Sequence, residues 1–226
     1  MRTIVEELTR VRPDLVDPTG LVTAGLVFVD GRPVDNPRSQ VRPGAAIVVR
    51  AETSLRGSAK LAAALDRFGV MVDGRVCLDC GAAAGGFTRV LLDRGARLVY
   101  AVDAGHGQLL GSLRQDPRVV NREGVNLADV VVDQPVDLVT LDLSYLSLAD
   151  AVPQLRFGTE LVALVKPMFE LHLDHAPTDD RSLADAVERA VAGVEAAGWS
   201  VAATMDSPVT GGKGAREALL HAFLAR

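Results

Sequence analysis

The sequence predicts an α/β fold in which helices cover both faces of a mostly parallel β-sheet, with a small module in front. Apolar segments of strand length alternate with segments of helical spacing, an alternation that is typical of parallel sheets. The expected strands lie near residues 75–80, 97–103, 118–122, 136–143, 160–166, 200–205 and 218–224, and the expected helices near 86–94, 107–114, 148–155 and 183–197. Because no helix separates the last two of these seven strands, we expect the last strand to enter the sheet antiparallel.

Residues 1–50 are expected to form the small N-terminal α/β module. The segment 22–34 indicates the end of a helix and then a hairpin that turns at Asp30 and Gly31, and residues 45–50 add one more strand. With seven arginines and six acidic residues, the module is nearly neutral. Residues 51–55 form a polar bridge into the larger domain, residues 51–226, whose first helix is predicted over 56–68 by its apolar spacing.

The composition is that of a folded globular chain. With 226 residues, of which 48% are hydrophobic and 23% charged, it can bury one large core and a small appendage. No apolar run reaches the roughly 20 residues of a membrane span, and Glu6 and Glu7 stand where a signal peptide has its apolar centre. We therefore expect a cytoplasmic protein without membrane contact. Cys77 and Cys80 would point to opposite faces of one strand, which favours buried thiols over a disulfide or a metal site.

A glycine-rich turn between the first strand and the next helix is the first candidate site. Residues 77–88 run from an apolar strand through an acidic residue and small residues into a helix, and such a turn can cradle a nucleotide-like ligand. Asp103 ends the next strand, roughly 20 residues after the glycines, where a carboxylate can bind ribose hydroxyls. The turn lacks the G-x-G-x-x-G spacing of dinucleotide sites, so S-adenosylmethionine (SAM) is the better candidate ligand. A turn with only a packing role remains the alternative.

Four charged residues are expected at the same edge of the sheet. Asp142 and Lys166 end two apolar strands, Glu217 precedes the last strand, and Lys60 lies in the helix before the sheet. The lysines stand out because the chain has only three, Lys213 being the other, among 24 basic residues. Two ammonium and two carboxylate groups in one cleft can share protons, and such a lysine can orient or deprotonate a hydroxyl. Ordinary surface charges are the alternative, above all for Lys60 and Glu217.

Five segments together make the chain resemble the TlyA branch of the FtsJ-like ribose methyltransferases, over roughly residues 50–225. The segments are 77–88, 99–109, 113–120, 142–148 and 164–170. The resemblance implies a class I SAM methyltransferase fold with a Rossmann-like sheet, SAM as methyl donor, an RNA ribose 2′-hydroxyl as acceptor, and an RNA-binding module in front. It places a catalytic tetrad on Lys60, Asp142, Lys166 and Glu217, and it assigns the cofactor to Asp79, Gly81, Gly85, Gly86, Phe87, Asp103, Asn126 and Asp142.

The sequence departs from the family pattern on the side of the acceptor. Ala83 and Ala84 replace a Ser-Thr pair, and the loop 171–180 is short and acidic. Residues 51–226 hold 17 basic and 23 acidic residues, although arginines at positions 56, 89, 94, 114, 118 and 122 could form a local RNA-binding patch. The alternative function is therefore a SAM-dependent enzyme of specialised metabolism. Its acceptor would be a small molecule, or SAM itself, closed to an azetidine with release of methylthioadenosine.

The loop 171–180 has two further interpretations. His172, Asp174 and His175 could bind a metal, but ligands so close on one loop are more often a polar loop, and we expect no metal. Together with Tyr145, the loop could instead form an acceptor pocket that Met168 and Phe169 wall. A non-catalytic RNA-binding protein is disfavoured by the tetrad, and a homodimer is left open.

Overall fold

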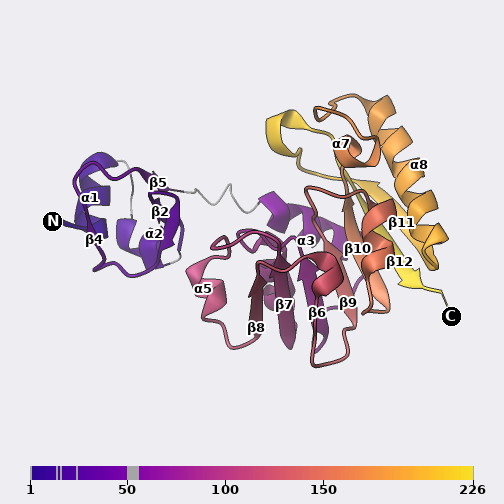
Figure 1. Cartoon of the computed structure of the whole chain (residues 1–226), viewed down its shortest axis with the longest axis horizontal. Helices are drawn as coiled ribbons and strands as arrows, with labels where there is room; N and C mark the ends of the chain where they lie inside the picture. Colours follow the sequence, from indigo (N-terminus) through magenta and orange to yellow (C-terminus); the bar gives the residue numbers. More distant parts are fainter. Residues whose placement is uncertain (1, 14, 16, 24, 50–55, 226) are drawn as a thin grey trace.

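The computed structural model describes residues 2–13, 15, 17–23, 25–49 and 56–225, and it contains the predicted seven-stranded sheet (Figure 1). Its strands are β6 (Val76–Cys80), β7 (Leu98–Asp103), β8 (Val119–Glu123), β9 (Leu138–Leu141), β10 (Glu160–Val165), β11 (Trp199–Asp206) and β12 (Ala218–Leu224). The strand order is β11-β12-β10-β9-β6-β7-β8, and β12 is antiparallel to both neighbours while the other neighbouring pairs are parallel. The predicted fold class and the antiparallel last strand are confirmed.

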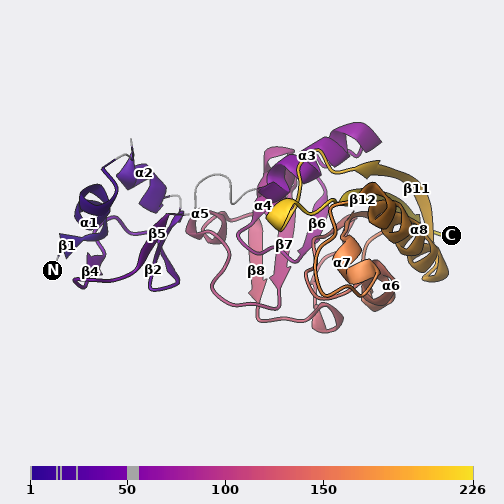
Figure 2. The same ribbon diagram turned by 90° about the horizontal axis from the view of Figure 1, so that it is seen from above.

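Helices cover both faces of this sheet, as Figure 2 shows. One face carries α3 (Arg56–Phe68), α4 (Gly86–Asp93) and α5 (Gly111–Arg114), and the other carries α6 (Leu148–Ala151), α7 (Pro167–Glu170) and α8 (Asp180–Ala196). Each face has its own apolar core. Cys77 belongs to the core under α3 and α4, and Cys80 to the core under α8, so the two thiols are buried on opposite faces as predicted. In the part of the chain that the structure describes, no helix is long and apolar enough to cross a bilayer.

Several helix boundaries differ from those predicted by the sequence, each for a local reason. The helix expected over 107–114 is confined to α5, because the N–H groups of Gln108 and Leu109 donate to the Glu123 carboxylate and not to helical carbonyls. The helix α8 begins earlier than expected, at Asp180, because the Asp179 side chain caps it. The short α7 was not expected; it starts with a proline, which suits the first turn of a helix. Short 3₁₀ helices lie at Leu127–Asp129, Val152–Gln154 and Gly212–Gly214.

The N-terminal module has a small core of its own. It consists of β1 (Arg2–Thr3), α1 (Ile4–Val11), α2 (Pro18–Thr23), β2 (Val27–Val29), β3 (Arg32–Val34), β4 (Gln40–Val41) and β5 (Ile47–Val49). The predicted hairpin is β2–β3; both of its turn residues, Asp30 and Gly31, have positive φ, as a tight turn of the type I′ class requires. The polar bridge, and with it the predicted boundary at residues 50 and 51, lies outside the described residues.

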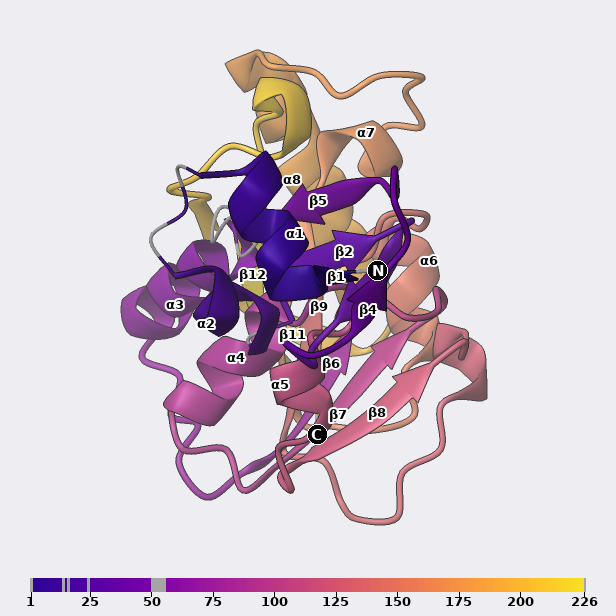
Figure 3. The ribbon, with the colours of Figure 1, turned by 90° about the vertical axis from the view of Figure 1, so that its left-hand side faces the viewer.

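The module lies beside α5, in front of the sheet in the view of Figure 3. Leu26 of the module belongs to the same apolar cluster as Leu110 and Leu113 of the larger domain. The Gln115 side chain also donates a 3.4 Å hydrogen bond to Asp35. The module therefore contacts the larger domain at the helix that follows β7.

Candidate functional site

The glycine turn after β6 is shaped by two close approaches. Gly81 has φ +83°, and a Cβ at this position would lie 2.3 Å from the carbonyl oxygen of Asp142. Gly85 has φ +97°, and a Cβ there would lie 2.1 Å from a methyl group of Leu113. Both glycines are needed for conformation and for space, so the turn can lie directly against the ends of β9 and α5. Two cavities lie against the backbone of this turn, one on each side of it.

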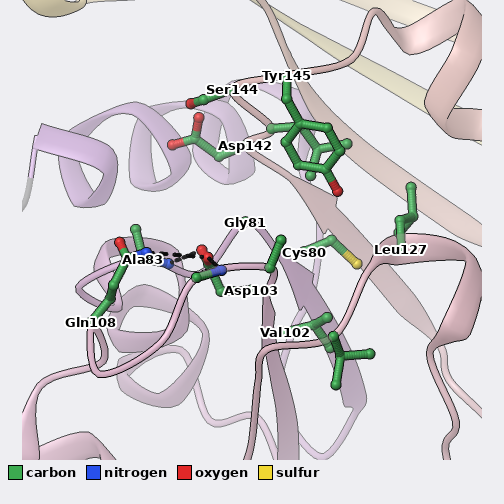
Figure 4. Close-up of a pocket in the computed structure, with 14 residues that line it drawn as sticks. Cys80, Gly81, Ala83, Val102, Asp103, Gln108, Leu127, Asp142, Ser144 and Tyr145 are labelled. Carbon is green, nitrogen blue, oxygen red and sulfur yellow. Dashed lines mark hydrogen bonds between the residues drawn. The ribbon is translucent and has the colours of Figure 1, made fainter.

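The first cavity, of about 260 Å³, lies between the turn and the ends of β7 and β9 (Figure 4). Asp103 forms part of its wall; its carboxylate accepts hydrogen bonds from the N–H groups of Ala83, at 2.9 Å, and Gly105, at 2.7 Å. Asp142, Ser144 and Tyr145 line the opposite side. The remaining wall is mostly apolar and consists of Cys80, Gly81, Val102, Ala104, Gln108, Val125, Leu127 and Leu143. A carboxylate beside an apolar slot suits a ribose attached to a planar base.

The second cavity, of about 350 Å³, lies on the other side of the turn, toward the first residues of α3. It is lined by Gly57, by residues 81–84 of the turn, by Gly86 and Phe87 at the start of α4, and by Asp142. Asp142 therefore borders both cavities. A ligand that spans them would pass over the glycine turn, with Asp142 facing its middle.

Three of the residues predicted for the cofactor, Asp79, Gly85 and Asn126, do not line these cavities. Asp79 is fully buried and accepts hydrogen bonds from the hydroxyls of Thr88, at 2.6 Å, and Thr140, at 2.9 Å. Burial raises the pKa of Asp79 to about 6, although the two hydroxyls lower it. In the structure, this carboxylate joins β6 to α4 and β9. Asn126 is exposed, between Val125 and Leu127, which do line the first cavity. Their cofactor role stays a prediction.

The four charged residues of the predicted tetrad form two ion pairs at the edge of the sheet. Lys60 is paired with Glu217, and both side chains are buried. Lys166 is paired with Asp142 at 2.6 Å and donates a 3.0 Å hydrogen bond to the hydroxyl of Ser144. Val165 lies opposite Ala218 in the β10–β12 ladder, so Lys166 and Glu217 follow at neighbouring positions beyond it. The structure thus brings the four predicted residues to one place.

A third cavity, of about 440 Å³, begins at Lys166 and Glu217. One wall is Pro167, Met168 and Phe169 of α7, and the other walls are Asp174, His175 and Ala176 together with Gly212, Ala215 and Arg216. Ser144 lines this cavity as well as the first one, so it stands between them. Met168, Phe169 and the loop 171–180 do share a cavity, as the sequence suggested, whereas Tyr145 lines the first cavity instead.

Sequence reasoning missed Ser144, Gln108 and Glu170. Ser144 follows Asp142 by two residues at a strand end, which was the available signal for a second polar group at that edge. Gln108 lines the first cavity, and its amide donates a 3.4 Å hydrogen bond to Asp103. Glu170 is buried and accepts a hydrogen bond from the N–H of Leu148. The amino-acid sequence around this glutamate does not predict that it is buried.

The sequence also suggested the histidines of the loop 171–180 as metal ligands and several arginines as an RNA-binding patch. No group of three or more His, Cys, Asp and Glu side chains among the described residues is arranged to hold a metal. Of the suggested arginine patch, Arg94, Arg114 and Arg118 are paired with carboxylates, and Arg89 hydrogen-bonds Ser112. These ion pairs neutralise three of the charges that such a patch would offer to phosphates.

The fold is that of class I SAM methyltransferases. A magnesium protoporphyrin IX methyltransferase from Synechocystis, solved with bound S-adenosylhomocysteine, has the same fold, with a TM-score of 0.53 at 16% identity over 76% of this chain and 84% of that one. The family model of the FtsJ-like methyltransferases matches residues 54–223. The chain belongs to this family, in its TlyA group.

Two curated relatives show how far the similarity extends. The 16S/23S rRNA (cytidine-2′-O)-methyltransferase TlyA of Mycobacterium tuberculosis is 46% identical over 162 residues, which are 67% of this chain and 60% of the relative. Hemolysin A of Brachyspira hyodysenteriae is 32% identical over 216 residues, which are 89% of this chain and 90% of the relative. The first match spans less than two thirds of the TlyA protein, whereas the second covers about nine tenths of both chains.

Proposed function

We propose that the chain is a SAM-dependent methyltransferase that acts on the 2′-hydroxyl of a ribose in ribosomal RNA. The observation that carries the proposal is the position of Lys166, whose side chain is held by Asp142 and Ser144 where the first and third cavities adjoin. A cofactor in the first two cavities and an acceptor in the third would meet at this group. The M. tuberculosis relative, whose name gives it this reaction on cytidine, supports the same assignment.

The residues of the first two cavities fit SAM. Asp103 can accept hydrogen bonds from the ribose hydroxyls, and the slot between Val102 and Leu127 suits the adenine. The amino-acid part would lie over the glycine turn, whose residues 81–84 line the second cavity together with Gly86. Bound there, SAM supplies a methyl group on a sulfonium, which an oxygen nucleophile can attack in line.

Lys166 orients the acceptor in this proposal. Its Nζ hydrogen-bonds the acceptor hydroxyl and aligns the oxygen with the methyl group, so that the C–O bond forms as the C–S bond breaks. The hydroxyl must lose its proton in the process. The carboxylate of Asp142, 2.6 Å from the Lys166 ammonium, can take up that proton and release it to solvent.

The second ion pair has a positioning role. Glu217 lines the third cavity, and its carboxylate is held by Lys60 from behind, in α3. A buried carboxylate with a fixed orientation can accept a hydrogen bond from the acceptor ribose without rearrangement. Lys60 lines none of the three cavities, so it acts through Glu217.

The partner RNA and the location of the protein remain predictions. A net charge of −5 means that RNA binding needs a local arrangement of arginines, and Arg32, Arg38 and Arg122 are exposed. We also expect, from the ribosomal substrate, that the protein works in the cytoplasm, and a homodimer stays open.

The decisive experiment measures product formation with and without RNA. The purified protein is incubated with SAM and transcribed 16S or 23S rRNA, and 2′-O-methylated nucleosides are then quantified by mass spectrometry. We expect 2′-O-methylation with one S-adenosylhomocysteine per methyl group. Methylthioadenosine formed from SAM alone would instead establish the ring-closing alternative, and S-adenosylhomocysteine formed only with a small-molecule acceptor would refute the RNA assignment.

A further inference from the structure

The polar groups of the third cavity fall into two sets, those already paired and those left free. Lys166 is bound to Asp142 and Ser144, and Glu217 to Lys60. Arg216 is bound to two carboxylates, those of Asp180 and Asp206. The side chains of Asp174 and His175 also line this cavity, and within the described ranges neither has a hydrogen bond or an ion pair. The groups available for a ligand are therefore one carboxylate and one imidazole, next to each other in the chain.

Asp174 and His175 line the same cavity as Lys166 and belong to the loop that follows α7. Lys166 marks the end where the acceptor ribose must lie, and the helix α7 leads away from it with Met168 and Phe169 as an apolar wall. A nucleotide with its 2′-hydroxyl at Lys166 would extend its base along that wall. Apolar and aromatic side chains are the surface on which proteins stack an unpaired base. The edge of that base would then face Asp174 and His175.

A carboxylate beside an imidazole distinguishes among bases by hydrogen bonding. Asp174 can only accept, so it requires an amino group, whereas an N–H of His175 can donate to a ring nitrogen or a carbonyl. Cytosine offers its N4 amino group next to the N3 acceptor, which matches this pair. Uracil offers a carbonyl next to an N–H, the reverse pattern, and would place its O4 against the carboxylate. Adenine shares the cytosine pattern but is a larger purine.

We propose, on the basis of the function proposed above, that Asp174 and His175 read the base of the acceptor nucleotide and select cytosine over uracil. The two residues lie in the loop 171–180, which departs from the family pattern, so the proposal assigns the selection to residues of this chain and not to a family motif. Asp174 is exposed, and its replacement leaves the buried core intact. The substitution that tests the proposal is Asp174→Asn, because the asparagine amide can also donate to the O4 of uracil.

The test begins by mapping the nucleotide that the wild-type protein methylates in transcribed rRNA. Two transcripts are then prepared, with cytidine or uridine at that position, and kcat/KM is measured on both for three proteins: the wild type, Asp174→Asn and Asp185→Asn. Asp185 is an exposed aspartate of α8 that lines none of the three cavities and serves as the charge-matched control. SAM affinity is measured in parallel.

We expect the wild type and Asp185→Asn to prefer the cytidine transcript. Asp174→Asn should lower kcat/KM on cytidine by about tenfold to a hundredfold, the usual effect of one base contact, and raise it on uridine, with SAM affinity unchanged. The proposal is overturned if Asp174→Asn keeps the wild-type ratio of kcat/KM on the cytidine and uridine transcripts, or if the mapped nucleotide is a uridine or a purine. In either case, methylation of the rRNA by the wild type would still support the function proposed above. If the wild type methylates no RNA, that function fails, and this proposal fails with it.

Discussion

Lys60 and Glu217 are 157 residues apart in the chain, yet their side chains form an ion pair that is almost completely buried. The pair joins α3, which precedes the sheet, to the residue before its last inserted strand, β12. Taking two charges out of water is costly, and their attraction repays that cost only while both partners are present. Removing one partner of this pair should therefore lower both the stability of the fold and the activity.

The first prediction concerns this pair. Glu217→Gln should lower the free energy of unfolding by about 3 kcal/mol, because it leaves the Lys60 ammonium buried without a counter-charge. The double variant Lys60→Met, Glu217→Leu should recover most of the lost stability but not the methyl-transfer activity. Urea unfolding and turnover of both variants test this, and recovery of activity in the double variant would show that the pair has only a structural role.

Lys166→Ala should abolish most turnover while leaving cofactor binding intact. The lysine orients the acceptor hydroxyl in the proposed mechanism, and loss of such a group typically costs about 10²–10⁴-fold in rate. Lys166 does not line either cavity assigned to SAM, so the dissociation constant for SAM should change little. The rate is followed as S-adenosylhomocysteine release and the affinity by calorimetry. A variant that turns over at the wild-type rate would contradict the assigned role.

Gly81→Ala should weaken cofactor binding. Its Cβ would meet the carbonyl of Asp142 at 2.3 Å, so either the turn or the end of β9 must move, and both border the cavities. Gly74→Ala is the matched control, because Gly74 also has positive φ, +72°, but open space around it. An alanine with positive φ should destabilise both variants by about 1–2 kcal/mol. Only Gly81→Ala should also weaken SAM binding, by at least about tenfold. Equal affinities for SAM in the two variants would refute this account of the turn.

Glu170 should make stability depend on pH. One carboxylate oxygen accepts the N–H of Leu148, and the other is buried without a hydrogen-bond partner among the residues that the structure describes. Burial raises the pKa of Glu170 from 4.5 to about 7, against the hydrogen bond from Leu148 and the charge of Arg189, which lower it, while Asp150 raises it further. The folded state therefore holds this proton more tightly than the unfolded state. The associated stability is fully present below about pH 4.5 and is lost as the pH rises to about 7.

The check is the change in unfolding free energy between pH 5 and pH 8 for the wild type, Glu170→Gln and the control Glu195→Gln on the exposed side of α8. Over this interval the wild type and the control should lose more unfolding free energy than Glu170→Gln does. The difference should be about 1.4 kcal/mol for each unit by which folding raises the pKa of Glu170. Asp79, whose pKa is also raised, contributes equally to all three proteins and cancels. The same pH dependence in all three proteins would contradict the assignment to Glu170.

The strands could be predicted closely because each is a short apolar run bounded by polar or glycine residues. Helix boundaries were predicted less well where side chains from elsewhere intervene: Glu123 captures the N–H groups that a longer α5 would use, and the Asp179 cap starts α8 early. The role of Asp79 shows the same limit. From the sequence it was a candidate ligand at the glycine turn, whereas in the structure Thr88 and Thr140 bind its carboxylate in the interior.

The sequence by itself determined the α/β class, the antiparallel last strand, the glycine turn and the identity of the four charged residues at the sheet edge. These features depend on local periodicity and on residues that end strands, which can be seen within short segments. Only the tertiary structure decided how the charges pair, Lys60 with Glu217 and Lys166 with Asp142, and that Asp174 lines the same cavity as Lys166. Pairing depends on strand order and register, which bring together segments that are distant in the chain, and no local pattern encodes that proximity.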